Sequence, residues 1–268
     1  LSPAPIAKVV KVLKIRLFEH SIIEVKAPTI LIAGCGTGQH SINTAARFKN
    51  AKVLAIDLSL SSLAYAQRKT EALGVQNLEY MQADLLDLGQ LNKTFDIIES
   101  AGVLHHMENP MAGWKVLASC LKSGGLMKIG LYSELARQHI VKMREEIQQL
   151  GMGTDDIGMK RFRNEVISSK APHHQLIISS PDFHSMDSLR DLLFHVQEHR
   201  FTIPQIQHCL TELGLKFCGF EVGTITPDFK RSNSGEDDAY DLIKWHAYEQ
   251  AHPPAFAGMY QFWCQKVG

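Results

Sequence analysis

A short glycine-rich segment has the composition of a ligand-binding loop. Residues 34–38 are Gly-Cys-Gly-Thr-Gly, and they directly follow the continuous apolar run 29–33. Glycines let the backbone approach a ligand closely, and the helical pattern that follows would offer unpaired N–H groups at its N-terminus. A dinucleotide-binding fingerprint would have its third glycine where this chain has Gln39, which argues against a nicotinamide cofactor.

Two aspartates could act together with this loop. Asp57 ends a second apolar run, residues 52–56, at the distance of about twenty residues where a carboxylate can accept both hydroxyls of a ribose. Asp84 ends a third run, residues 77–83. Ligands of open α/β sheets bind at the carboxyl ends of the strands, so we expect the glycines and both aspartates to converge there.

The segments that must position these residues alternate between strand and helix. Helical patterns follow residue 38, cover 60–73 up to the capping Gly74, and start again at Asn109-Pro110. This alternation predicts a doubly wound α/β sheet. The expected strands are residues 29–33, 52–56, 77–83, 95–99, 126–131, 215–222 and 258–265, with a helix over 204–213 before the last two.

Four ordered segments resemble the successive motifs of class I S-adenosylmethionine-dependent methyltransferases. They are 30–38 (ILIAGCGTG), 55–59 (AIDLS), 83–85 (ADL) and 95–106, which begins FDIIES and ends VLHH. The resemblance implies a Rossmann-like fold with a seven-stranded, mostly parallel sheet of order 3-2-1-4-5-7-6. It also implies S-adenosyl-L-methionine as the cofactor and direct displacement at its sulfonium methyl.

The resemblance assigns cofactor contacts to individual positions. The loop would lie against the methionine part, Asp57 would hold the ribose, and Asp84 with the Leu85 backbone would hold the adenine. The complete expected set is Ala33, Gly34, Gly36, Gly38, Asp57, Leu58, Asp84, Leu85 and Ser100.

One position departs from the family's pattern. Ile32 stands where the first strand usually ends in Asp or Glu, a carboxylate that commonly helps to orient the amino-acid end of the cofactor. Another group must then accept the hydrogen bond from the amino-acid end of the cofactor, or cofactor binding is weaker. Two alternatives therefore stay open, a non-catalytic S-adenosylmethionine-binding module and an NAD(P)-dependent oxidoreductase, the latter opposed by Gln39.

The chain is longer than the cofactor-binding motifs require. Apolar residues at positions 9, 10, 13, 17 and 18 predict an amphipathic helix in the lead-in, and helical patterns recur at 135–150, 157–168 and 188–199. An insertion after the fifth strand would hang over the strand ends as a lid and acceptor pocket. We expect a lead-in (1–27), a cofactor-binding half (28–134), a helical insertion (135–199) and C-terminal strands of the same domain (200–268).

A narrower resemblance covers segments 130–137, 190–202 and 256–263. They are similar to the methyltransferase domains that follow tetratricopeptide repeats in some bacterial proteins. No such repeats lie in the chain itself. The resemblance would make the first helix a junction to a preceding repeat region.

Candidate catalytic residues follow from the chemistry of methyl transfer. The enzyme mainly aligns the nucleophile with the methyl group and excludes water, and it needs a base only if the acceptor must lose a proton. The candidate bases near the strand ends or the lid are His105, His106, Tyr132, His195 and Glu198.

Composition excludes several other classes of function. The 28 Lys+Arg and 28 Asp+Glu residues give a formal net charge of zero, which argues against nucleic acid as a partner. No apolar run is long enough for a membrane helix, so no membrane partner is expected. The acceptor that we expect is a small molecule or a protein or peptide side chain.

The spacing of the cysteines and histidines indicates the cellular compartment and whether a metal site is expected. Five scattered cysteines without a Cys-x-x-Cys pair suggest neither a disulfide framework nor a zinc site, and they favour a cytoplasmic location. The adjacent pairs His105-His106 and His173-His174 lack the spacing of three or four residues that chelation on a helix needs. We therefore expect no metal.

Overall fold

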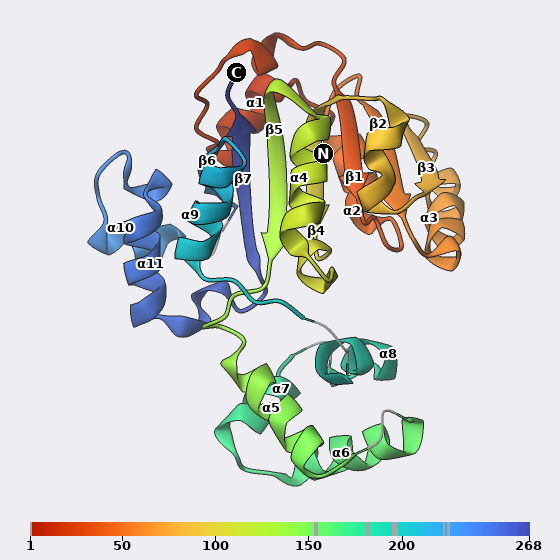
Figure 1. The fold of residues 1–268 in the computed structure, drawn as a ribbon, viewed down its shortest axis with the longest axis vertical. Coiled ribbons are helices and arrows are strands. Elements are labelled where there is room, and N and C mark those ends of the chain that lie inside the picture. The colour runs from red at the N-terminus through yellow and green to blue at the C-terminus, as the bar shows by residue number, and fades with distance from the viewer. Residues whose placement is uncertain (1, 153–154, 181–182, 195–197, 222, 224–225) are drawn as a thin grey trace.

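Seven strands form one sheet in the computed structural model of the chain (Figure 1). The structure describes residues 2–152, 155–180, 183–194, 198–221, 223 and 226–268. The strand order is β3-β2-β1-β4-β5-β7-β6, and β7 alone in this order runs antiparallel to its neighbours β5 and β6. The expected doubly wound α/β fold and its strand order are confirmed.

The strands are the apolar runs of the sequence, with one extension. β5 begins five residues before the expected start because Leu121 already pairs with Phe95, across an irregularity in the ladder between β4 and β5. The strands are β1 (Thr29–Ala33), β2 (Lys52–Asp57), β3 (Leu78–Gln82), β4 (Phe95–Ala101), β5 (Leu121–Leu131), β6 (Leu215–Phe220) and β7 (Tyr260–Lys266).

Helices cover both faces of the sheet because successive strand side chains point to opposite faces. Ile32 packs with α1, α2 and α3 on one face, whereas Leu31 packs with α4, α9 and α11 on the other. These helices are α1 (Ile6–Leu13), α2 (Gln39–Arg47), α3 (Leu60–Ala72), α4 (Pro110–Cys120), α9 (Ile203–Glu212) and α11 (Leu242–Ala251). Shorter segments are α10 (Thr226–Ser232) and the 3-10 turns η1 (Ser21–Glu24), η2 (Leu85–Leu91), η3 (Leu104–His106), η6 (Asp238–Tyr240) and η7 (Pro253–Phe256).

The first helix is shorter than its apolar pattern predicted. α1 ends at Leu13 because Lys14 adopts a left-handed conformation (φ 55°) and its N–H caps the last turn. The chain then runs along β6, where the Arg16 N–H donates to the Cys218 carbonyl at 2.9 Å. Positions 17 and 18 therefore lie outside the helix in which the sequence placed them.

The helical insertion between β5 and α9 has its own hydrophobic core. Its helices are α5 (Gln138–Gln149), α6 (Asp156–Ser168), α7 (Pro172–Ile178) and α8 (Met186–Leu189), followed by a π-helical turn over Arg190–Phe194. Figure 1 shows them beyond the carboxyl end of β5, apart from the sheet. Helix α7 lies outside the helical patterns that the sequence predicted, and the helix expected over 188–199 begins at Met186 and changes to π geometry at Arg190.

Among the residues that the structure describes, no helix combines the length and the apolar character needed to cross a membrane.

Candidate active site

A cavity of about 750 Å³ opens at the carboxyl ends of β1, β2 and β4. Its size lies within the range of about 300–1,000 Å³ that is typical of small-molecule sites. Six of the nine expected cofactor-binding residues line it: Gly34, Gly36, Asp57, Leu58, Asp84 and Leu85. The other three, Ala33, Gly38 and Ser100, lie outside its wall, and Ala33 and Ser100 are buried in the sheet.

Two glycines of the loop are required for different steric reasons. Gly36 has a left-handed φ of 52°, and no atom lies within 4 Å of the position that a Cβ would occupy there. By contrast, a Cβ on Gly38 would lie 2.6 Å from the Ala66 Cβ and 2.8 Å from the Tyr80 hydroxyl. Gly36 therefore leaves room for a ligand, whereas Gly38 allows α2 to pack against α3 and β3.

The Asp57 carboxylate is held in place by two backbone N–H groups, one from the glycine loop and one from Ser59. Its Oδ2 accepts the Gly36 N–H at 2.7 Å, and its Oδ1 accepts the Ser59 N–H at 2.9 Å. A carboxylate oxygen can accept two hydrogen bonds, so each still has capacity for a ribose hydroxyl. Burial, and secondly the charge of Asp57, raise the pKa of the Cys35 thiol to about 11, so this lining residue stays protonated.

Asp84 also lines the cavity, at the start of η2. Its Oδ1 accepts the Leu86 N–H at 2.9 Å, which holds the carboxylate beside the backbone of Leu85. Open space beside Gly36 and two oriented carboxylates fit a ligand with a ribose and an adenine.

Glu99 lies within the motif at residues 95–106, but the sequence assigned no role to it. It stands opposite Ile32 in the register of β1 and β4, one strand away from the position where an acidic residue was missing. Its buried Oε2 accepts hydrogen bonds from His40 Nε2 at 2.5 Å and from Thr44 Oγ1 at 2.9 Å. His40 in turn lines the cavity. The signal in the sequence was a glutamate directly after the apolar pair Ile97-Ile98 in a buried strand.

The Glu99 carboxylate is ionised in this environment. Although its burial opposes ionisation, the hydrogen bond and the charge of His40 keep the pKa of Glu99 below its ordinary value. Its other oxygen, Oε1, is buried without a hydrogen-bond partner among the described residues. A buried ionised carboxylate of this kind is typical of a functional site.

Three of the five catalytic candidates form one aromatic cluster. The His105 ring stacks on Tyr132 with centroids 3.8 Å apart, and His106 meets His105 edge-on at 4.4 Å. His106 lines the first cavity, and Tyr132 lines a second cavity of about 700 Å³ between the insertion and the segment before β7. The ring cluster therefore borders both cavities. His195 lies outside the described residues.

Glu198 occupies a different environment from the one that a base would need. Its side chain is 1% exposed and accepts two hydrogen bonds from Arg137, at 3.0 and 2.7 Å, and one from Arg144 at 3.0 Å. The Arg137 guanidinium also covers the Tyr132 ring at 3.6 Å. Because the carboxylate is buried and already bonded to two arginines, the geometry favours a structural role over the predicted one.

Comparisons with known proteins agree with this geometry. Residues 30–125 match the family model described as a methyltransferase domain. The structure of PKMT2 from Rickettsia typhi superimposes with a TM-score of 0.72 at 14% identity, covering 98% of this chain and 53% of that one. The chain has the class I methyltransferase fold. The complex of the same Rickettsia protein with AdoHcy gives a TM-score of 0.68 at 15% identity, over 99% of this chain and 53% of that one.

Sequence relatives extend the comparison beyond the fold. An uncharacterized protein of Synechococcus sp. is 33% identical over 235 residues, covering 82% of this chain and 56% of its own length. A probable (S)-tetrahydroprotoberberine N-methyltransferase of Papaver bracteatum is 30% identical over 99 residues, 37% of this chain and 27% of that one. The chain spans little more than half the length of the Synechococcus and Rickettsia proteins. These matches agree with the class I methyltransferase fold that the sequence predicted.

Proposed function

We propose that this chain transfers a methyl group from S-adenosylmethionine to a small molecule or to a protein or peptide side chain, by direct displacement. The observation that carries the proposal is the cavity at the strand ends, where the glycine loop and the Asp57 carboxylate meet. It lies within the segment that matches a methyltransferase domain.

Different residues of the first cavity would bind different parts of the cofactor. Asp57 accepts the ribose hydroxyls, while Asp84 and the backbone of Leu85 receive the adenine. Gly36 leaves space for the methionine part. When bound, the cofactor supplies a methyl group on a positively charged sulfur, and the protein's task is to orient it and to exclude water.

Glu99 and His40 take the place of the missing acidic residue at position 32. Glu99 holds the imidazole of His40 through its Nε2, and His40 faces the cavity beside Ile32. We assign to His40 the contact with the amino-acid end of the cofactor, and to Glu99 the positioning of His40.

The second cavity is the proposed acceptor site. Its wall comes from the insertion, through residues such as His139 and Leu176, and from Tyr132 at the end of β5. The rings of His106 and Tyr132, which border the two cavities, are 5.9 Å apart. Direct displacement needs the nucleophile in contact with the methyl group, so an acceptor held there must extend its nucleophile past these rings to the cofactor. His106 and Tyr132 are therefore the candidates for proton transfer. Glu198 would hold Arg137 beneath them.

Calorimetry with S-adenosylmethionine and its demethylated product tests the cofactor assignment. Loss of a hydrogen bond to a charged group costs about 1.5–3 kcal/mol, so Asp57→Asn should weaken binding by about tenfold or more. The control is Asp87→Asn, on η2 outside the cavity wall, which should bind as the wild type does. A folded wild-type protein that binds neither compound would refute the proposal.

Two further measurements separate the alternatives. Methyl transfer to any acceptor, measured as cofactor consumption, distinguishes an enzyme from a binding module, which would bind the cofactor without turnover. A fluorescence titration with NAD(H) tests the oxidoreductase, and saturable NAD(H) binding without S-adenosylmethionine binding would support it instead.

A further inference from the structure

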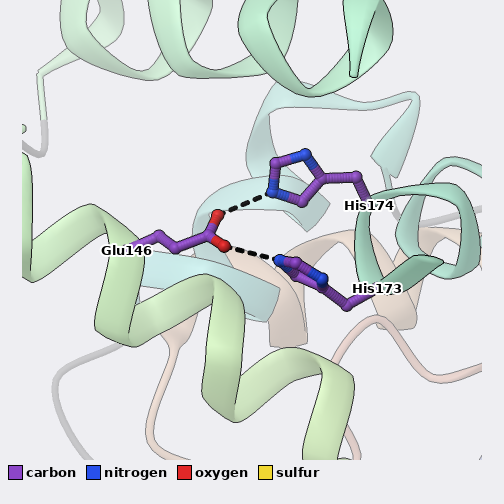
Figure 2. Close-up of side chains that lie close together, drawn as sticks. All are labelled: Glu146, His173 and His174. Carbon is purple, nitrogen blue, oxygen red and sulfur yellow. Dashed lines mark hydrogen bonds and ion pairs between the residues drawn. The ribbon is translucent and has the colours of Figure 1, made fainter. Parts of the chain in front are cut away.

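Two helices of the insertion bring a carboxylate and two imidazoles together (Figure 2). Glu146 on α5 points between His173 and His174, which lie in the first turn of α7. His173 Nε2 lies 2.5 Å from one carboxylate oxygen, and His174 Nε2 lies 2.6 Å from the other. One donor atom from each residue can be chosen so that all three lie within 4.8 Å of one another.

The core of the insertion fixes this arrangement. Met143 and Ile147 on α5, and Ile177 on α7, are buried in one hydrophobic cluster that holds the two helices together. Glu146 lies beside the buried stripe of its helix, and both histidines lie within four residues of Ile177 on theirs. The three polar side chains therefore meet at the rim of the cluster, where their exposed fractions are 33%, 20% and 13%.

We propose that Glu146, His173 and His174 form a binding site for a divalent transition metal, with Zn²⁺ as the best match. Two imidazole nitrogens and one carboxylate oxygen are a ligand set that suits zinc. Three protein ligands leave a fourth position for water, and the partial exposure of the site gives water access to it.

Sequence spacing alone could not reveal this set. Neighbouring residues on a helix point in different directions, which is why the pair His173-His174 suggested no chelation. The third ligand comes from 27 and 28 residues away and enters between the two rings, so the histidines need not point the same way.

The distances define what metal binding must change. The observed N···O distances are hydrogen-bond lengths, whereas two ligands of a tetrahedral zinc ion are about 3.3 Å apart. With one carboxylate oxygen as the ligand, the imidazole that contacts this oxygen must move back by roughly 0.7–0.8 Å, and the other imidazole must turn towards the same ion. In both rings Nε2 presents its lone pair and Nδ1 carries the proton.

The surroundings set the strength of the site. His174 Nδ1 is buried without a partner among the described residues, whereas zinc-binding histidines usually donate this N–H to an acceptor. Loss of such a partner typically lowers metal affinity by about 10–100-fold. We therefore expect a reversible site that is weaker than a closed structural zinc site.

Binding here would rigidify the wall of the second cavity. His139 and Ile140 on α5, Leu176 on α7 and Ser179 directly after α7 line that cavity. A metal that bridges the two helices fixes the separation of these lining residues. This consequence rests on the proposed function, whereas metal binding itself does not.

Titration of the chelator-treated full chain with ZnCl₂ in a calorimeter tests the site. The wild type should bind one Zn²⁺ per chain with an affinity that His174→Gln and Glu146→Gln each lower by about tenfold or more. The control is His208→Gln, which alters an exposed His/Glu pair on α9 with no third ligand among the described residues. It should leave binding unchanged.

Circular dichroism must show that each variant is folded. Glu146→Gln provides the test if His174→Gln disturbs α7, because its amide oxygen still accepts a hydrogen bond from one histidine. Substitution with Co²⁺ should give the visible absorption bands of a tetrahedral site in the wild type and in His208→Gln, but not in His174→Gln or Glu146→Gln. Absence of Zn²⁺ binding to the folded wild type, or equal affinity in wild type and both variants, would overturn the proposal. Either result is independent of S-adenosylmethionine binding, which is measured separately.

Discussion

Glu198→Gln distinguishes the structural role of this residue from the catalytic role that the sequence suggested. The Glu198 side chain is 1% exposed and pairs with Arg137, which is 6% exposed, and with the more accessible Arg144 and Arg200. The substitution keeps the shape and one acceptor oxygen of the side chain. It removes the negative charge that compensates the buried Arg137 guanidinium.

The geometry gives the size of the effect. Removing one partner of a buried ion pair costs about 3–5 kcal/mol, because the other charge is left without compensation in a medium of low polarity. The amide still accepts a hydrogen bond, so we expect the lower end, about 3 kcal/mol of the free energy of unfolding. With an m-value of about 1–3 kcal/mol per molar urea, the midpoint should fall by roughly 1 M or more.

Urea unfolding with two probes is the assay. Far-UV circular dichroism follows all helices, whereas the three tryptophans, Trp114, Trp245 and Trp263, lie outside the insertion and report on the sheet. Glu134→Gln is the matched control, because Glu134 pairs with Arg200 near the surface and should change stability by less than about 1 kcal/mol.

A catalytic base would give the opposite pattern, since its loss would abolish activity and leave the midpoint unchanged. The structural role is wrong if Glu198→Gln lowers the free energy of unfolding by no more than Glu134→Gln does.

Three further predictions follow from single side chains. Glu99→Gln should weaken binding of the demethylated cofactor by about tenfold in calorimetry, because a neutral amide holds His40 less strongly; an unchanged affinity contradicts the positioning role. Gly38→Ala should cost about 1–3 kcal/mol in urea unfolding, because its φ is 86° and its Cβ would meet Ala66; a change within the error of the measurement contradicts the packing argument. Burial raises the pKa of Glu249, so the unfolded chain releases this proton at lower pH than the folded one does, and stability should fall as pH rises above about 4.5. Glu249→Gln should flatten that part of the melting temperature–pH curve, and an equal slope in both proteins would count against it.

The sequence was sufficient for elements whose signals are local. The apolar runs before Gly34 and Asp57 predicted buried parallel strands, because a strand covered on both faces needs apolar side chains throughout. Helix α7 was missed because its first turn carries Pro172 and two histidines in place of an apolar stripe. The end of α1 was misplaced because the left-handed conformation of Lys14, which is not a glycine, leaves no sequence signal.

The tertiary structure decided the partners of the buried charges. Glu99 meets His40 across 59 residues, Glu198 meets Arg137 across 61, and Glu146 meets two histidines across 27 and 28. None of these pairs has a fixed sequence spacing, because each depends on how two elements pack. By itself the sequence determined the glycine loop, the two aspartates and the strands, since backbone conformation and strand burial are local properties. The strand order was implied by the resemblance to a known family. Whether a buried carboxylate pairs with a histidine or with an arginine follows only from the packing of elements that lie far apart in the chain.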